Sequence, residues 1–231
     1  MALYAISDLH LSFGTDKPMN IFGSKWENYT EKLKENWQKK VKVEDVVIIP
    51  GDISWAMYLE EAMEDFEFLN SLNGTKLILK GNHDYWWTTM SKMETFLKEN
   101  DFSTIKILNN TAYLYENIAI CGTRGWNFAP ENSTGEDRKI FEREKLRLVM
   151  SLEEAKAYKS EKIVVAMHFP PISEENQDFF NIAKEYGANV LLYGHLHASA
   201  HKNAIEGERE GIDIRLVSCD YINFDPILLE I

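Results

Sequence analysis

Two kinds of hydrophobic pattern alternate along most of the chain. Short apolar runs have the length of strands, and between them lie segments in which apolar residues recur every three or four positions, as on one face of a helix. The apolar runs predict strands at residues 3–7, 46–49, 77–79, 163–167, 190–193, 212–217 and 226–231. The helical spacing predicts helices at about residues 25–40, 59–69, 90–97, 136–158 and 179–186.

The middle of the chain has a different pattern. Residues 105–108, 112–115 and 118–121 are three short apolar runs, and the turns between them, at 109–110 and 116–117, contain asparagine. This spacing predicts an antiparallel meander rather than a strand–helix–strand crossover. Helices and strands alternating on both sides of a meander predict two sheets packed face to face, with the helices outside.

Length and composition suit one well-packed domain. The chain has 231 residues, of which 45% are hydrophobic, and it contains no Gly/Ser-rich or Pro-rich linker and no repeat of fixed period. We therefore expect a single domain over residues 1–231. No apolar stretch approaches the roughly 20 residues that span a bilayer. The first apolar run has no basic residues before it, so we expect a core strand there and not a signal peptide.

Charge and cysteine content narrow the possible partners. The formal net charge of −12 and the pI near 5.0 argue against nonspecific binding to nucleic acid or to anionic membranes, which carry charge of the same sign. Cys121 and Cys219 each lie in an apolar run, which predicts two buried free thiols in a reducing cytoplasm.

Five short polar clusters follow strand-like runs and contain five of the six histidines. They are Asp8-Leu9-His10, Gly51-Asp52, Gly81-Asn82-His83-Asp84, His168 and Gly194-His195-Leu196-His197. The sixth histidine, His201, lies outside the clusters, and we expect it at the surface. Loops at sheet ends collect reactive side chains, so the clusters predict one site assembled from distant segments. Carboxylate, imidazole and amide ligands without thiolate suit hard-to-borderline divalent metals.

Two divalent metals can share these side chains. If Asp52 bridges, each metal obtains about four protein ligands and keeps positions for water or substrate. Two dications against the carboxylates of Asp8 and Asp52 leave a local charge of about +2, which attracts a phosphate despite the acidic surface. Metals roughly 3.5–4 Å apart ionise a shared water near neutral pH, and that bridging hydroxide can attack a phosphoester. The clusters therefore predict a dinuclear phosphohydrolase.

The set of clusters resembles the calcineurin-like metallophosphoesterases, the superfamily of purple acid phosphatases and Ser/Thr phosphoprotein phosphatases. The family pattern D-x-H, G-D, G-N-H-[DE], H and G-H-x-H is complete between residues 8 and 197. The resemblance implies an α/β fold with four layers, an α/β/β/α sandwich of two face-to-face mixed sheets.

The same resemblance implies a role for each cluster residue. Asp8, His10, Asp52 and His197 would hold one metal, and Asp52, Asn82, His168 and His195 the other. His83 would stabilise the transition state or protonate the leaving oxygen, and Asp84 would orient the His83 ring. Manganese is favoured, and iron, zinc, nickel or cobalt also fits mixed oxygen and nitrogen ligands.

Taken singly, these residues also fit ordinary structural roles. His10 or His168 alone is typical of a hydrogen-bonded core histidine, and Asp52 alone of a helix N-cap. Their joint occurrence in family order favours the metal site. A non-catalytic metal-binding scaffold of the same fold and a nuclease are the alternatives. The complete residue set opposes the first, and the acidic surface opposes the second.

Candidates for substrate binding lie next to the clusters. Trp55, Trp86, Trp87 and Trp126 lie near cluster loops or strand ends. An indole there can stack on a nucleobase or another flat group, although packing in the core or at the rim explains these residues equally well. We expect a small phosphorylated substrate, a monoester or diester, with nucleotide-like groups included. Residues 7–12 are also similar to UDP-diacylglucosamine pyrophosphatases, but His83 replaces an arginine of that subgroup, which disfavours its substrate.

Arg124 is the basic candidate for substrate binding. It follows a central strand and can form a two-pronged contact with a phosphate. Arg138, Lys139 and Arg143 can join it from around the segment 127–137, which we expect to be mobile. An ordinary solvated helix face also explains these three residues.

Overall fold

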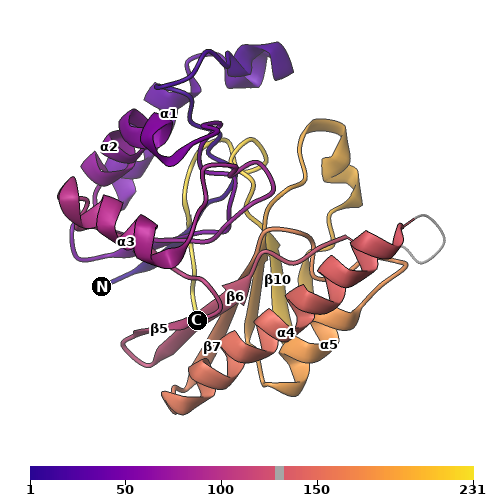
Figure 1. Cartoon of the computed structure of the whole chain (residues 1–231). Coiled ribbons are helices and arrows are strands. Elements are labelled where there is room, and N and C mark those ends of the chain that lie inside the picture. Colours follow the sequence, from indigo (N-terminus) through magenta and orange to yellow (C-terminus); the bar gives the residue numbers. More distant parts are fainter. Residues whose placement is uncertain (128–132) are drawn as a thin grey trace.

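The computed structural model describes residues 1–127 and 133–231 and contains two mixed sheets (Figure 1). The first sheet has the strand order β11-β1-β2-β3-β4. Its strands are β1 (Leu3–Ala5), β2 (Val46–Ile49), β3 (Thr75–Ile78), β4 (Ile105–Ile107) and β11 (Ile227–Leu228). β1 to β4 run parallel to one another, and β11 pairs antiparallel with β1.

The second sheet has the strand order β5-β6-β7-β8-β10-β9. Its strands are β5 (Ala112–Tyr115), β6 (Ile118–Thr123), β7 (Lys162–Met167), β8 (Val190–Tyr193), β9 (Gly207–Arg209) and β10 (Ile212–Leu216). The four central strands are parallel, and the edge strands β5 and β9 are antiparallel to their neighbours. The two sheets bound three layers of hydrophobic core, one between the sheets and one on the outer face of each.

Helices cover the outer faces of the two sheets (Figure 1). Three of them pack on the first sheet: α1 (Tyr29–Lys40), α2 (Met63–Ser71) and α3 (Met90–Glu99). The second sheet is covered by α4 (Gly135–Ala157) and α5 (Asp178–Glu185). Short 3-10 helices lie in the connecting loops: η1 (Met19–Phe22), η2 (Ser24–Trp26), η3 (Leu59–Ala62) and η4 (Ala198–Asn203).

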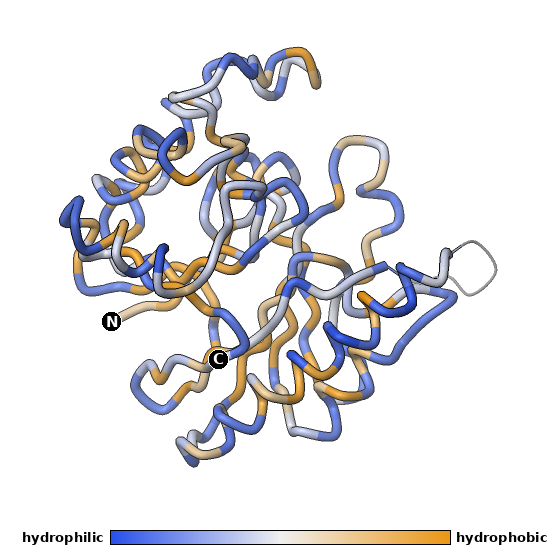
Figure 2. The backbone as a smooth tube through the Cα atoms, in the orientation of Figure 1, coloured by the Kyte–Doolittle hydropathy of each residue, from blue (hydrophilic) through white to orange (hydrophobic). Residues whose placement is uncertain are grey.

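Alternating side chains along the strands fill separate layers of the core. In β2, Val46 and Ile48 point into the cluster between the sheets, whereas Val47 and Ile49 pack against the helices. This is the two-residue period of a strand that is buried on both faces. Figure 2 shows the hydropathy that accompanies this burial, since the strands are mostly orange and the helices mix orange with blue. The expected α/β/β/α sandwich of four layers is therefore confirmed.

The ends of β1 and β10 join the two sheets. The Ser7 amide donates to the Val217 carbonyl over 2.8 Å, and the Cys219 amide donates to the Ser7 carbonyl over 2.9 Å. These bonds place the loop after β1 directly beside the loop after β10. Side chains that follow strands of either sheet can therefore meet at this junction.

The predicted meander is wrong. β4 pairs in parallel with β3 in the first sheet, while β5 and β6 form a hairpin in the second. The Asn109-Asn110 turn thus carries the chain from one sheet to the other. Turn residues report where a chain changes direction but not which strand it pairs with next.

Most other predicted elements are confirmed, with shifted boundaries. The helix expected from residue 25 begins at Tyr29, because Asn28 has a left-handed conformation with φ of 50° that separates it from η2. The strand β9 and the 3-10 helix η4 were not predicted. Within the described ranges, none of the helices has both the length and the apolar character needed to cross a membrane.

Candidate metal centre

The predicted metal ligands lie in loops that follow parallel strands of both sheets. Those from the first sheet are Asp8 and His10 after β1, Asp52 after β2 and Asn82 after β3; those from the second are His168 after β7, and His195 and His197 after β8. Because parallel strands present the same ends to one edge of a sheet, these seven side chains converge where the sheets meet.

Asp8, His10 and His197 form the first group of ligand atoms, and these atoms lie within 4.8 Å of one another. The Nε2 atoms of His10 and His197 are 3.2 Å apart, and His197 Nε2 is 3.4 Å from Asp8 Oδ1. Two ring nitrogens and a carboxylate oxygen that face one point are the donors that a divalent transition metal prefers.

The second group consists of Asp8, Asp52 and His168, again with ligand atoms within 4.8 Å of one another. Asn82 joins this group, since its Oδ1 lies 2.7 Å from His168 Nε2 and 2.8 Å from His195 Nδ1. Asp52 Oδ2 lies 3.5 Å from His168 Nε2 and 3.8 Å from His10 Nε2, between the two groups. Asp8 belongs to both groups, so either carboxylate has a position from which it can bridge two metals.

Burial sets the charge states of these ligands. It lowers the pKa of His10 and His168 to about 3, so both rings are neutral and keep a free lone pair. It also raises the pKa of Asp52, as do the neighbouring charges of Asp84 and Asp8. An ionised Asp52 next to Asp8 and Asp84 needs a compensating positive charge, and divalent cations would supply it. The residues present therefore fit a metal centre.

The backbone of the centre is held in an uncommon conformation. Four predicted ligands have φ in the left-handed region: Asp8 at 60°, His10 at 47°, Asp52 at 53° and His195 at 73°. Each such residue costs about 1 kcal/mol or more, and this strain is typical of functional sites. Glycines allow the loops to approach, since a Cβ on Gly81 would overlap Asp52 Oδ1 and one on Gly194 would overlap Asp8 Oδ2.

The hydrogen bonds of Asp84 differ from those expected of a residue that orients the His83 ring. Its buried carboxylate accepts hydrogen bonds from the amides of Gly81, Asp52, Ile53 and Ser54 and from the Trp86 indole. Within the described residues, no hydrogen bond or ion pair joins it to the His83 ring, and His83 Nδ1 is buried without a partner. Asp84 ties two ligand loops together instead. The motif spacing gave no means of telling these roles apart.

Asp220 is a functional candidate that sequence reasoning missed. Its Oδ1 lies 2.8 Å from His197 Nδ1, on the side of the ring away from Asp8, and its Oδ2 accepts from the Ala198 amide. Burial lowers the pKa of His197, but the charges of Asp8 and Asp220 outweigh it and raise that pKa to about 10. A carboxylate behind a metal-binding imidazole orients it and increases its basicity. The available signal was an acidic residue shortly after the strand at 212–217.

An aromatic cavity of about 250 Å³ opens beside the histidines. Its lining comprises His10, His83 and His197 together with Met19, Phe22, Trp26, Trp55 and Ala198. Trp55 stacks on His10 with 4.9 Å between ring centroids, and Lys17 Nζ lies 4.1 Å from the Trp55 centroid. Trp55 is therefore next to the centre, whereas Trp86 is a buried core residue and Trp87 packs at the rim of the first core. Trp26, expected only as helix packing, lines the same cavity as Trp55.

Trp126 and Arg124 lie on another side of the centre. The Trp126 ring packs on Phe169, whose ring is 4.3 Å from that of His195, so among the described residues Phe169 lies between Trp126 and the centre. The Arg124 guanidinium lies 4.8 Å from the Trp126 ring centroid and lines a basic cavity with Arg143. Residues 128–132 of the segment expected to be mobile lie outside the described residues.

Arg138 and Lys139 agree with the solvated-face alternative, whereas His201 differs from expectation. Arg138 and Lys139 are exposed and do not line the basic cavity, and Lys139 pairs with Glu136 over 3.8 Å. His201 is half-buried rather than at the open surface, with Nε2 3.3 Å from Asp220 Oδ2. The two cysteines are free and buried as expected, and Cys219 Sγ donates to the Asp8 carbonyl over 2.8 Å.

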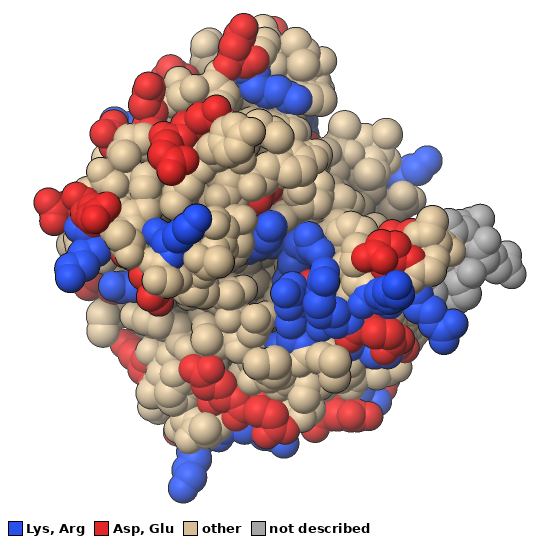
Figure 3. All heavy atoms as spheres, in the orientation of Figure 1, with Lys and Arg blue, Asp and Glu red and all other residues tan. Residues whose placement is uncertain are grey.

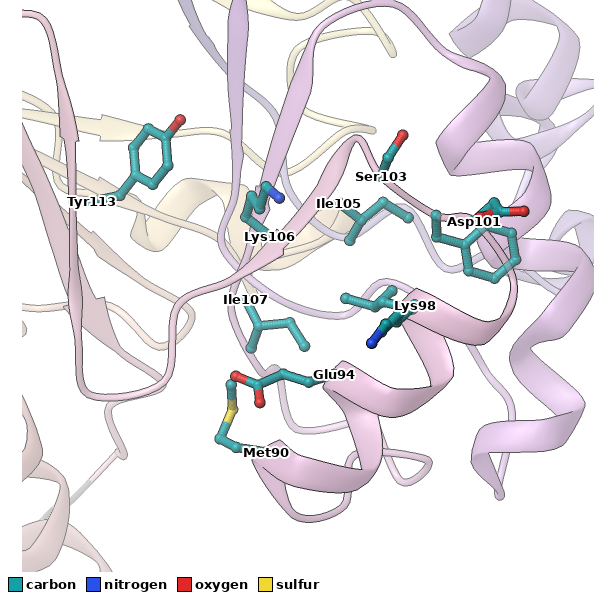
Figure 4. Close-up of a pocket in the computed structure, with 11 residues that line it drawn as sticks. Met90, Glu94, Lys98, Asp101, Ser103, Ile105, Lys106, Ile107 and Tyr113 are labelled. Carbon is teal, nitrogen blue, oxygen red and sulfur yellow. The ribbon is translucent and has the colours of Figure 1, made fainter.

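A further hollow of about 570 Å³ lies away from the histidines, between α3, the edge strand β4 and Tyr113 of β5 (Figure 4). Its described lining is mainly apolar with scattered charges such as Glu94 and Lys98, and it includes none of the predicted metal ligands. The chemistry of this chain is therefore concentrated at the junction of the sheets.

Solved structures share this fold at low sequence identity. A protein of unknown function, AQ665, from Aquifex aeolicus is 17% identical, with 98% of this chain and 95% of that chain covered and a TM-score of 0.50. The phosphopantetheinyl hydrolase PptH from Mycobacterium tuberculosis is 14% identical, with 99% and 95% covered and a TM-score of 0.55. TT1561 of Thermus thermophilus is 9% identical, with 98% and 97% covered and a TM-score of 0.59. At such identities the likeness shows the fold alone.

Sequence comparison identifies the family. A search of curated proteins found no match. The family model described as calcineurin-like phosphoesterase matches residues 1–199, which include all five clusters. The chain therefore belongs to the calcineurin-like phosphoesterase family.

Proposed function

We propose that this chain is a dinuclear metal-dependent hydrolase of phosphomonoesters or phosphodiesters, organised as one domain over residues 1–231. The observation that carries the proposal is the convergence of oxygen and nitrogen ligands from both sheets into two groups that share Asp8. Membership of the calcineurin-like phosphoesterase family, which implies metal-dependent phosphoester hydrolysis, supports it.

The family pattern implies the metal-binding roles. Asp8, His10, Asp52 and His197 would hold one metal, and Asp52, Asn82, His168 and His195 would hold the other. The two groups of ligand atoms support this assignment, with Asp8 in both groups and Asp52 between them. When bound, the two metals supply Lewis acidity towards the phosphoryl oxygens and an ionised water as nucleophile. Asp220 holds the His197 ring in place through Nδ1, which leaves Nε2 to face the ligand group. Manganese is the metal that we expect to support turnover.

His83 acts on the substrate rather than on a metal. Its ring lies 4.4 Å from that of Trp55 and 5.8 Å from that of His10, measured between centroids, at the wall of the aromatic cavity. Burial lowers the pKa of His83, and the positive charge of Lys17 lowers it further. A neutral ring carries one N–H, so His83 donates a hydrogen bond to a phosphoryl or leaving oxygen. This favours transition-state stabilisation over full proton transfer.

The aromatic cavity supports an organic group on the substrate. Trp55, Trp26 and Phe22 give it an apolar side that faces His10 and His83. Flat or apolar groups gain stacking and burial against such a surface. The leaving group or the retained organic part, nucleotide-like groups included, therefore packs against Trp55, while the phosphoryl group lies over the ligands.

Turnover of bis-p-nitrophenyl phosphate and p-nitrophenyl phosphate with added Mn²⁺ tests the proposal. We expect hydrolysis that EDTA abolishes and that Asp52→Asn eliminates together with metal binding. His83→Ala should keep the metals and reduce kcat by roughly 10²–10³, because it removes the donor. The control is Asp225→Asn, which changes a surface carboxylate paired with Lys40 and should behave as wild type.

Two outcomes would contradict the proposal. An absence of EDTA-sensitive turnover with every divalent metal, in a chain that still binds metal, would favour the non-catalytic scaffold instead. Full kcat in His83→Ala would remove the role of that residue and leave the metal centre intact.

A further inference from the structure

A cluster of basic side chains surrounds a separate cavity beside the candidate metal centre. The cavity has a volume of about 210 Å³ and lies at the ends of β3, β4 and β6, against α4. Its polar lining includes Lys80, Arg124, Arg143 and Arg147, with the amides of Asn109 and Asn110. Figure 3 shows blue side chains gathered in the middle of this face, where α4 runs in Figure 1. Such a gathering is unusual on a chain with a net charge of −12.

One buried carboxylate organises the cluster. Glu144 is fully buried, and its Oε1 accepts from Arg147 Nη1 over 2.6 Å and lies 3.7 Å from Arg124 Nη2. Its Oε2 accepts from Thr123 Oγ1 over 2.6 Å. Glu144 therefore fixes two guanidinium groups, but its single charge leaves the four cations of the lining with an excess of about three positive charges.

Several donors of the cluster have no protein acceptor. Arg124 Nε is buried without a hydrogen-bond partner among the described residues. No ion pair or side-chain hydrogen bond is shown for Lys80 or Arg143 in the part of the chain that the structure describes. Burial lowers the pKa of Arg124, and the charges of Arg147 and Arg143 add to that effect. A buried donor and crowded like charges cost free energy that an anion would relieve.

Backbone connections fix this cavity relative to the metal centre. Lys80 directly precedes Gly81, whose amide donates to the Asp84 carboxylate that also holds Asp52. On the second sheet, the Arg124 carbonyl accepts the amide of His168 over 3.1 Å. An anion in the cavity would therefore have a fixed position with respect to a phosphoryl group at the metals.

We propose that this cavity binds a second phosphate of the substrate, so that the preferred substrates carry one phosphate group in addition to the phosphoester that is cleaved. The inference rests on the proposed phosphohydrolase function. Arginine forks match the geometry of phosphate oxygens and form charge-assisted hydrogen bonds, which are stronger than neutral ones. With three arginines, one lysine and two amides, the lining offers donors to every oxygen of a tetrahedral dianion, more than a planar carboxylate can accept.

A matched pair of chromogenic diesters tests the inference. Thymidine 5′-(p-nitrophenyl phosphate) and its 3′-phosphorylated form differ only in the second phosphate. We expect the Mn²⁺-loaded chain to have a kcat/KM at least about tenfold higher for the 3′-phosphorylated form, mainly through KM. Arg143→Ala should reduce this ratio about tenfold, because it removes a donor that has no partner among the described residues. Arg138→Ala, on the same helix but outside the cavity, is the matched control and should leave the ratio unchanged.

A binding measurement separates this inference from the proposed function. Calorimetry of pyrophosphate on the full chain in EDTA reports on the basic cavity without metals and without turnover. We expect binding that weakens about tenfold in Arg143→Ala and in Asn110→Asp, which adds a negative charge to the lining. Binding without turnover of either diester or of p-nitrophenyl phosphate would overturn the phosphohydrolase and keep the anion site. No binding at about 10 mM, binding equal in all variants, or equal kcat/KM for the two diesters would overturn the inference.

Discussion

The position of Asp84 leads to a prediction that separates a structural role from a catalytic one. Asp84→Asn replaces one carboxylate oxygen with an NH₂ group and changes little else in size. The oxygen Oδ2 accepts from the amides of Asp52 and Gly81, and Oδ1 accepts from the amides of Ile53 and Ser54 and from the Trp86 indole. Whichever way the asparagine is oriented, at least two N–H groups face another donor.

The magnitude follows from the number of donors that lose their acceptor. A buried N–H without an acceptor costs about 1–3 kcal/mol, so two of them cost about 2–6 kcal/mol of the free energy of unfolding. For a chain of 231 residues, 1 kcal/mol corresponds to about 2–4 °C in Tm. Asp84→Asn should therefore lower Tm by about 10 °C. Because the Asp52 amide loses its acceptor, affinity for Mn²⁺ should fall as well.

Calorimetric melting in EDTA measures the effect without any contribution from metal. Asp225→Asn, at an exposed ion pair with Lys40, should change Tm by no more than about 2 °C, as is usual for surface sites. An Asp84→Asn chain with wild-type Tm and metal affinity but strongly reduced kcat would refute the loop-tying role. It would restore the expectation that Asp84 orients the His83 ring.

Three further changes test other parts of the structure. Gly194→Ala should weaken Mn²⁺ binding in titration calorimetry, because its Cβ would overlap Asp8 Oδ2, and unchanged affinity would mean that this close approach is unimportant. Asp220→Asn should lower metal affinity about 10- to 100-fold by removing the carboxylate partner of His197 Nδ1. A wild-type affinity would mean that Asp220 only holds the loop at Ala198. Burial lowers the pKa of Lys76 in the folded chain to about 7, whereas in the unfolded chain it is about 10.4. The buried charge therefore reduces the free energy of unfolding by its full amount below pH 7, and this reduction disappears as the pH rises towards about 10.4. Lys76→Met should therefore raise the free energy of unfolding by about 1–3 kcal/mol at pH 6, and denaturant curves should show no such gain near pH 10.

The parts of the fold that follow from local patterns could be predicted. Apolar runs and helical spacing gave most strands and helices, because burial fixes those periods in each segment by itself. Strand pairing could not be obtained in this way. The runs at 105–108 and 112–115 look alike in sequence but belong to different sheets, since only long-range packing decides which edge a strand joins.

The candidate site shows the same division. The convergence of the seven predicted ligands was foreseeable, because each follows a strand and the family pattern fixes their order. The roles of Asp84 and Asp220 were not, since they depend on which groups meet through the fold rather than along the chain. Trp55 and Trp126 were equivalent in sequence, yet only Trp55 lines the cavity beside the histidines.

Because the candidate ligands come from both sheets, bound metals would cross-link the two halves of the sandwich at one edge. In the described part of the chain, backbone hydrogen bonds of Ser7 with Val217 and Cys219 connect the two sheets near that edge. A cavity-forming change such as Val164→Ala or Leu192→Ala, deep between the sheets, would let the halves shift and spread the ligands apart. The affinity of this chain for metal should therefore also depend on how tightly side chains pack between the sheets, at positions far from the ligands.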